Sequence, residues 1–205
     1  MLNSRAMSIA RQSYATLHTT RTANAGRLAG AVKAVLAQDQ GCVLQAVGPA
    51  AHSKALKAMV YATDFFEKDR PGLCVAADPR VHQVPADGGR PATTGIRFHL
   101  TLVPQLVVSE ADLMFSKSSN PGMFAAELAE KIRARNLVTL SGMGELPMSL
   151  ALKAMLIARK HLQLKDDEAL LAIPLVQELE SDSGQLKRTL LQCQRARAPK
   201  SALEA

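Results

Sequence analysis

The pentapeptide ALKAM occurs twice in this chain, at residues 55–59 and 151–155, which are 96 positions apart. Shifting the chain against itself by that distance aligns further identical residues without a gap. They are Asn24 with Asn120, Gly26 with Gly122, Ala29 with Ala125, Gly48 with Gly144 and Ser53 with Ser149. The register holds from Leu17 to Ala62, so five matching letters are not an isolated coincidence. The sequence therefore predicts two versions of one small domain.

A chain of 205 residues accommodates two such domains, each with its own core. We expect a basic extension at 1–12, a first domain at 13–104, a second at 109–195 and a polar tail at 196–205. The short connection 103–111 leaves little room for a flexible linker and predicts that the halves pack closely. The tail has no periodicity, and we expect it to be disordered or ordered only on a partner.

Each half has the pattern of strand, helix, strand, helix and two strands. Apolar residues at helical spacing, buried apolar runs and Asn, Gly or Pro at the turns define these elements. In the first half they are 14–19, 28–38, 42–47, 50–66, 73–77 and 96–103. In the second half they are 112–115, 124–135, 137–143, 147–161, 170–176 and 188–194. The polar segments 85–95 and 180–185 are predicted to be the turns between the last two strands.

The net charge is +7 and the pI is about 9.6, which favours an anionic partner or simply maintains solubility. Aromatic residues make up only 3%, too few for a platform that stacks single-stranded bases. No segment approaches the roughly 18 apolar residues that span a membrane. Residues 1–38 contain no acidic residue. This resembles an organellar transit segment, but the first repeat begins near Ser13, so we expect a short basic extension, with a transit segment as the alternative.

Three cysteines without a paired spacing indicate a reducing compartment and no zinc site. Cys42 and Cys74 lie in apolar runs and are predicted to be buried. The five histidines are scattered, and no nucleophile–histidine–carboxylate set, paired carboxylates or phosphate loop stands out. We therefore expect no enzyme activity, no cofactor and no metal.

Several longer motifs surround the repeated pentapeptide: SKSSNPG at 116–122, LQAVG at 44–48, SKALKAM at 53–59, LALKAMLIARK at 150–160 and LAIP at 171–174. In order and spacing they resemble the stage V sporulation protein S (SpoVS) family, whose fold is Alba-like. The resemblance implies an α/β protein, an α+β sandwich of two tandem Alba-like βαβαββ domains that form an intrachain pseudo-dimer. The second half is the more similar to the family.

The family is non-enzymatic, and its Alba-like relatives are dimers that bind DNA or RNA. The resemblance assigns nucleic-acid contacts to three places. The basic residue after the first strand corresponds to Arg21 and Lys117. The loop that enters the second helix, with that helix, corresponds to Ser53, Lys54, Lys57 and Lys153. The arm between the last two strands corresponds to Arg90, Lys187 and Arg188.

The residues themselves favour the first half for binding an anion. A glycine before a helix leaves free backbone N–H groups that suit a phosphate, as Gly48 does in GPAAHSK. In the second half the segment reads GELPMSL, where Glu145 places a negative charge and Leu150 replaces Lys54. We therefore expect the two halves to differ in function.

Two functions remain open at the level of sequence. The first is low-specificity nucleic-acid binding through phosphates. The second is a structural subunit that binds acidic protein surfaces in a large assembly, such as a ribonucleoprotein or the lattice of a ciliary axonemal microtubule. A cytoplasmic or cytoskeletal location fits either function, with an organelle as the alternative.

Overall fold

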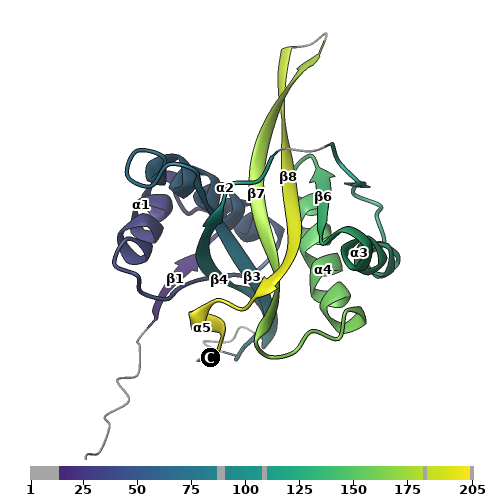
Figure 1. Cartoon of the computed structure of the whole chain (residues 1–205), viewed down its shortest axis with the longest axis horizontal. Coiled ribbons are helices and arrows are strands. Elements are labelled where there is room, and N and C mark those ends of the chain that lie inside the picture. The colour runs from purple at the N-terminus through teal and green to yellow at the C-terminus, as the bar shows by residue number, and fades with distance from the viewer. Residues whose placement is uncertain (1–13, 87–90, 108–109, 182–183, 204–205) are drawn as a thin grey trace, which may run out of the picture.

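The computed structural model describes residues 14–86, 91–107, 110–181 and 184–203. The first half contains β1 (Ala15–Thr19), α1 (Ala25–Leu36), β2 (Cys42–Ala46), α2 (Pro49–Phe66), β3 (Leu73–Val84) and β4 (Thr93–Pro104). The second contains β5 (Leu113–Phe115), α3 (Pro121–Arg135), β6 (Leu137–Gly142), α4 (Glu145–His161), β7 (Glu168–Ser181) and β8 (Gly184–Arg197). The predicted order of elements is confirmed in both halves (Figure 1).

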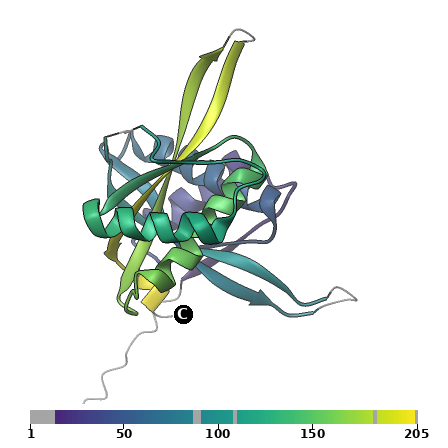
Figure 2. The same cartoon turned by 90° about the vertical axis from the view of Figure 1, so that its right-hand side faces the viewer.

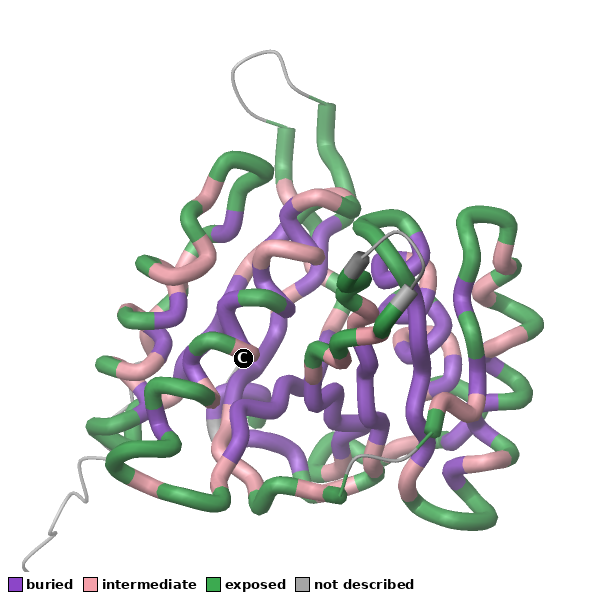
Figure 3. Tube along the Cα trace, turned by 90° about the horizontal axis from the view of Figure 1, so that it is seen from above, coloured by how far each residue is buried: buried purple, intermediate pink, exposed green. Residues whose placement is uncertain are grey.

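All eight strands form one sheet in the order β1-β2-β4-β3-β7-β8-β6-β5. Helices α1 to α4 cover one face, and their apolar sides form a single core with alternate residues of the strands. A smaller apolar cluster, which includes Cys74, Ala76 and Leu171, lies on the opposite face. Figure 3 shows that burial is concentrated in the middle of the sheet. The sequence prediction of an α/β fold with two closely packed halves is therefore confirmed.

The two halves are related by a pseudo-twofold axis at the centre of the sheet. β3 and β7 pair only at Ala77 and Ala172, which are equivalent residues because Pro79 and Pro174 follow each by two positions. The spacing between equivalent residues is 96 in the long helices and 95 in these strands. The connection from the long helix to the next strand is one residue shorter in the second half. Helices α2 and α4 also pack against each other across the axis. A single chain thus has the arrangement of a dimer.

Equivalent residues shape equivalent helix starts. The side chains of Asn24 and Asn120 cap α1 and α3, each accepting a backbone N–H of the first turn. Gly48 and Gly144 precede α2 and α4 with φ of +84° and +93°, a conformation that favours glycine. The identities that revealed the duplication therefore include residues that fix where each helix begins.

The two hairpins are longer than the sequence predicted. β3 continues to Val84 and β7 to Ser181, and the outer residues 80–84 and 175–180 alternate between exposed and half-buried. Figure 2 shows both hairpins projecting beyond the layer of helices as two-stranded arms. The antiparallel ladder satisfies the backbone hydrogen bonds of each arm without a hydrophobic core. Apolar runs alone therefore predicted strands that were too short.

The expectation of a disordered or partner-dependent tail is wrong for its described part. β8 continues to Arg197, and Lys200–Leu203 form a short helix, α5. Ala198 and Ala202 join the apolar cluster on the face opposite α1–α4. The Nη1 atom of Arg80 donates to the backbone oxygen of Ala202 at 3.1 Å. Two small residues four positions apart are too few to show as periodicity, yet they dock the tail on the first half.

The three cysteines are buried and unpaired, as predicted for Cys42 and Cys74. Burial raises the pKa of Cys42 to about 12 and that of Cys74 to about 11. Among the described residues, no group of three or more histidine, cysteine or carboxylate side chains is arranged to hold a metal ion. No helix in that part of the chain is long and apolar enough to cross a membrane.

Candidate nucleic-acid interface

A cavity of about 470 Å³ lies where β1 ends beside the outer part of the β3–β4 arm. We call it the basic cleft. The residues that line it are His18, Thr19, Thr20, Arg21, Gln45, Ala46, Val47, His82, Val84, Pro85 and Gly95. None of them is acidic. Of the predicted contact residues that the structure describes, Arg21 alone lies here, and its side chain is exposed.

Arg97 is a further basic residue of this region that sequence reasoning missed. When the side-chain amide of Gln45 is oriented with its oxygen toward Arg97, this oxygen accepts hydrogen bonds from Arg97 Nε at 2.8 Å and Nη2 at 3.1 Å. Nη2 also lies 3.5 Å from Nε2 of His82. The alternation of β4 could have indicated Arg97, because it places this residue on the face opposite the buried Ile96 and Phe98.

The electrostatics of the basic cleft are positive. The pKa of His82 is lowered by burial first, and then by the charge of Arg97 and by His18. The part of this shift that comes from Arg97 and His18 indicates a positive potential, in which an anion is stabilised. Gly95 permits this geometry, since a Cβ there would lie 2.8 Å from the backbone oxygen of Ala46.

The equivalent turn of the second half presents Lys117. Its side chain is exposed, and serine hydrogen bonds order the turn around it, including Ser116 N to Ser119 Oγ at 2.9 Å. Neither Arg21 nor Lys117 forms an ion pair with any described residue. Both predicted turn cations are therefore available to a ligand, but they lie in separate halves.

The lysines of the two ALKAM copies lie beside the helix starts of the opposite halves. Lys57 shares a groove with Gly144 and Glu145 at the start of α4. The charge of Lys153 contributes to lowering the pKa of His52, near the start of α2. Glu145 therefore shares a groove with a lysine of the other half. The predicted difference between the two loops thus places different charges on the two sides of the pseudo-twofold axis.

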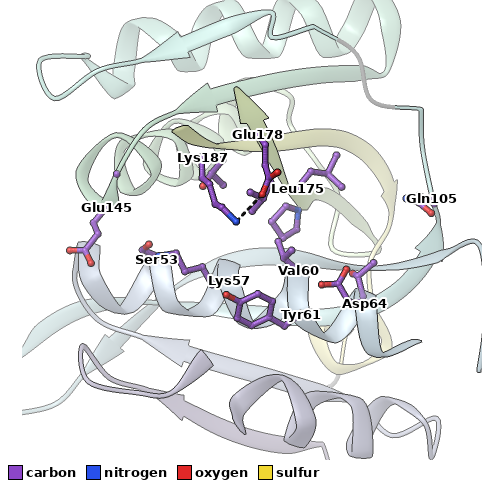
Figure 4. A pocket seen from close by; sticks show the side chains of 15 residues that line it. Ser53, Lys57, Val60, Tyr61, Asp64, Gln105, Glu145, Leu175, Glu178 and Lys187 are labelled. Carbon is purple, nitrogen blue, oxygen red and sulfur yellow. Dashed lines mark ion pairs between the residues drawn. The ribbon is translucent and has the colours of Figure 1, made fainter. Parts of the chain in front are cut away.

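The groove that contains Lys57 has a volume of about 650 Å³ and separates α2 from the β7–β8 arm. We call it the interdomain groove (Figure 4). Ser53, Lys57 and Lys187 are brought together there, together with Asp64, Glu145 and Glu178. The Nζ atom of Lys187 lies 2.8 Å from Oε1 of Glu178, an ion pair that raises the pKa of Lys187. Lysines and carboxylates are thus mixed in this groove.

The remaining predicted residues do not join either cavity. Lys54 is half-buried on α2, and Lys153 is exposed on α4. Arg188 donates from Nη2 to Oε1 of Gln177 at 2.5 Å, within the same arm. Arg90 lies outside the described residues. The structure thus distributes the predicted cations over several surfaces. In the basic cleft, Arg21 and the adjacent Arg97 lie where no acidic residue among those described lines the cavity.

Comparison with known proteins assigns the chain to a family. The family model described as Stage V sporulation protein S (SpoVS) matches residues 15–103 and again residues 111–194. No curated protein matches the chain. The two matched segments correspond to the two halves of the sheet, each with one βαβαββ unit. The chain therefore belongs to the Stage V sporulation protein S (SpoVS) family and carries two tandem copies of its domain.

Proposed function

We propose that the chain is a non-enzymatic protein that binds nucleic acid with low sequence specificity, through phosphate contacts centred on the basic cleft. The observation that carries the proposal is the gathering of Arg21, His18, His82 and the adjacent Arg97 around a cavity that no carboxylate of the described residues lines. Such side chains contact phosphates, which position a protein on nucleic acid without reading its sequence.

The arms and the remaining cations extend this surface. The cleft extends along the outer part of the β3–β4 arm, because His82, Val84, Pro85 and Gly95 line it. Lys117 offers a similar turn cation in the second half. Only Tyr61 and Phe65 are exposed among the described aromatic residues. Binding through the backbone rather than through stacked bases therefore fits the surface.

A salt titration tests the proposal. Filter binding against mixed DNA and mixed RNA should show affinity at low salt, and the affinity should fall as salt rises. Replacing both Arg21 and Arg97 with glutamine should reduce the slope of log affinity against log salt by about one to two. Arg27→Gln is the matched control, because Arg27 is exposed on α1 outside the cleft. Absence of binding at low salt, or equal losses in both variants, would refute the proposal.

The interdomain groove supports a second candidate, a subunit that binds protein in a large assembly such as a ribonucleoprotein or a cytoskeletal lattice. Exposed Tyr61 and Val176 line this groove beside charges of both signs, a composition typical of protein-binding surfaces. Cell fractionation separates the two candidates. Release of the protein by nuclease favours nucleic-acid binding, whereas retention in an insoluble fraction after digestion favours the assembly role.

A further inference from the structure

The pseudo-twofold axis shows what would occupy the interdomain groove if the two halves were identical. The place equivalent to the groove lies between α4 and the β3–β4 arm. There Arg159 of α4 reaches the buried carboxylate of Asp78, and its Nη2 donates to the backbone oxygen of Glu168 at 3.3 Å. The Nε atom of Arg80 binds the same carboxylate at 2.8 Å. One side of the pseudo-dimer is thus closed by an intrachain ion-pair network.

Substitutions at equivalent positions remove this network from the other side. Thr63 stands where Arg159 would be, and Ile173 stands where Asp78 would be. The strand registers and the 96-residue offset between α2 and α4 give three further exchanges to smaller or apolar side chains. These are Arg80 to Leu175, Leu156 to Val60 and Ile96 to Thr189. Thr63, Leu175, Val60 and Thr189 all line the groove, so its open volume follows from the loss of the residues that fill its counterpart.

The groove has an apolar floor and acidic ends. Val60, Pro174 and Leu175 provide apolar surface, while Glu145 and Asp64 lie toward opposite ends in Figure 4. Neither of these two carboxylates forms an ion pair with a described residue, whereas Glu178 neutralises Lys187. The charges that remain in the groove are the positive charge of Lys57 and the negative charges of Asp64 and Glu145. The side chains therefore complement a ligand that is apolar in its middle and cationic at its ends.

The backbone beside the groove favours an extended ligand. Because β7 pairs with β3 only at Ala172, its edge beyond Pro174 has no strand partner among the described residues. Exposed Glu178 and Glu180 lie along this free part of the strand. An open edge can accept another strand by hydrogen bonding to its main chain, and side chains at alternate positions then enter an adjacent pocket. Glu180, which forms no ion pair with a described residue, favours a basic residue in the strand that is added.

We propose that the interdomain groove binds an extended segment of a partner protein, with an aliphatic residue flanked at two-residue spacing by basic residues. The spacing follows from strand alternation, because side chains two positions apart in an added strand lie on the same face. Basic residues four positions apart in an extended strand are separated by about 13 Å. The aliphatic side chain would occupy the floor over Leu175, with the basic side chains near Asp64 and Glu145. This proposal goes beyond nucleic-acid binding and uses a different surface.

The test is a titration of the full chain with the peptide Thr-Lys-Thr-Leu-Thr-Lys-Thr, followed by NMR. We expect backbone amide shifts in Val176 to Glu180 and in the α2 residues of the groove, with saturation below millimolar peptide. Asp64→Asn with Glu145→Gln should weaken binding about five- to tenfold. Thr63→Arg with Thr189→Ile, which installs the residues of the filled counterpart, should abolish it. Thermal melting verifies that each variant is folded.

Two controls make the outcome decisive. Glu67→Gln changes an exposed carboxylate of the α2 end outside the groove and should leave the affinity for the peptide unchanged. A peptide with glutamate in place of both lysines should bind at least about tenfold more weakly. Absence of shifts at millimolar lysine peptide, shifts confined to other surfaces, or peptide-sensitive self-association of the chain would overturn the proposal. Nucleic-acid binding by the same variants should be unchanged, which separates failure here from failure of the basic cleft.

Discussion

The Nδ1 atom of His52 lies 2.9 Å from the Oγ atom of Ser149, joining the starts of α2 and α4 across the pseudo-twofold axis. Both residues are buried. The equivalent pair on the other side of the axis is Met148 with Ser53, in which the imidazole is replaced by a thioether side chain. This hydrogen bond between the helix starts is therefore present on one side of the pseudo-twofold axis and absent at the equivalent pair on the other.

Removing this hydrogen bond should destabilise the pseudo-dimer. Ser149→Ala leaves the imidazole nitrogen without its partner in a buried place, and we expect a loss of about 1–3 kcal/mol in the free energy of unfolding. Ser53→Ala is the matched control, because Ser53 is only half-buried and should lose about 0.5 kcal/mol or less. Denaturant melts of the two variants check this expectation. Equal losses would show that the contact contributes nothing specific.

Acid should destabilise the fold through two buried histidines. Burial is the main cause that lowers the pKa of both His52 and His99 to about 4. For His99 the nearby charge of Arg80 adds to this effect. Since an unfolded histidine has a pKa of about 6.5, the unfolded chain binds protons first as the pH falls. The stability contributed by the neutral histidines is complete above pH 6.5 and is lost progressively down to pH 4.

The loss at pH 4 amounts to roughly 3 kcal/mol for each histidine. We expect the difference in unfolding free energy between pH 7 and pH 4 to shrink by a similar amount in His52→Gln and in His99→Gln. The measurement is a series of denaturant melts between those pH values, with each variant compared with the unchanged chain at every pH. Identical pH profiles for all three proteins would contradict this account.

The network around Asp78 supports a prediction about the two sides of the pseudo-dimer. Asp78 is fully buried, and burial raises its pKa while Arg159 and Arg80 oppose that shift. Asp78→Ala leaves two guanidinium groups without their carboxylate and should cost about 3–5 kcal/mol of stability. Replacing all three residues with their equivalents, as Asp78→Ile, Arg80→Leu and Arg159→Thr, should recover most of that loss. A triple variant no more stable than the single one, by denaturant melting, would refute the assigned equivalence.

The sequence was sufficient for the duplication, the order of elements and the tight pairing of the halves, because these depend on periodic apolar residues and on repeated turn residues. It could not place single charges. Asp78, in the segment ADPR, has the composition of an exposed turn, yet β3 carries it into the interface, where Arg159 from the other half neutralises it. Lys187 is a basic arm residue in sequence, but cross-strand pairing places it against Glu178.

The candidate sites depend even more on long-range geometry. The basic cleft requires β4 to approach β2 closely at Gly95, and the interdomain groove requires the pseudo-twofold axis to bring α2 beside β7. Neither arrangement is encoded in local spacing. Arg97 is different, since strand alternation alone places it on the face of the sheet where His82 lies, and it could have been predicted.

The docked tail supports the last prediction. α5 and Ala198 cover an apolar cluster that contains Cys74, whereas Cys42 and Cys193 lie in the main core under the helices. A chain that ends at Pro199 should therefore expose Cys74 while the other two thiols stay protected. In the truncated chain we expect maleimide to alkylate Cys74 about tenfold faster or more than in the full chain, as measured by mass spectrometry of peptides. Leu203→Ala is the control, because Leu203 is 48% exposed and should leave the labelling rate unchanged. Faster labelling of all three cysteines would instead indicate global unfolding, and unchanged labelling of Cys74 would show that the tail does not protect this face.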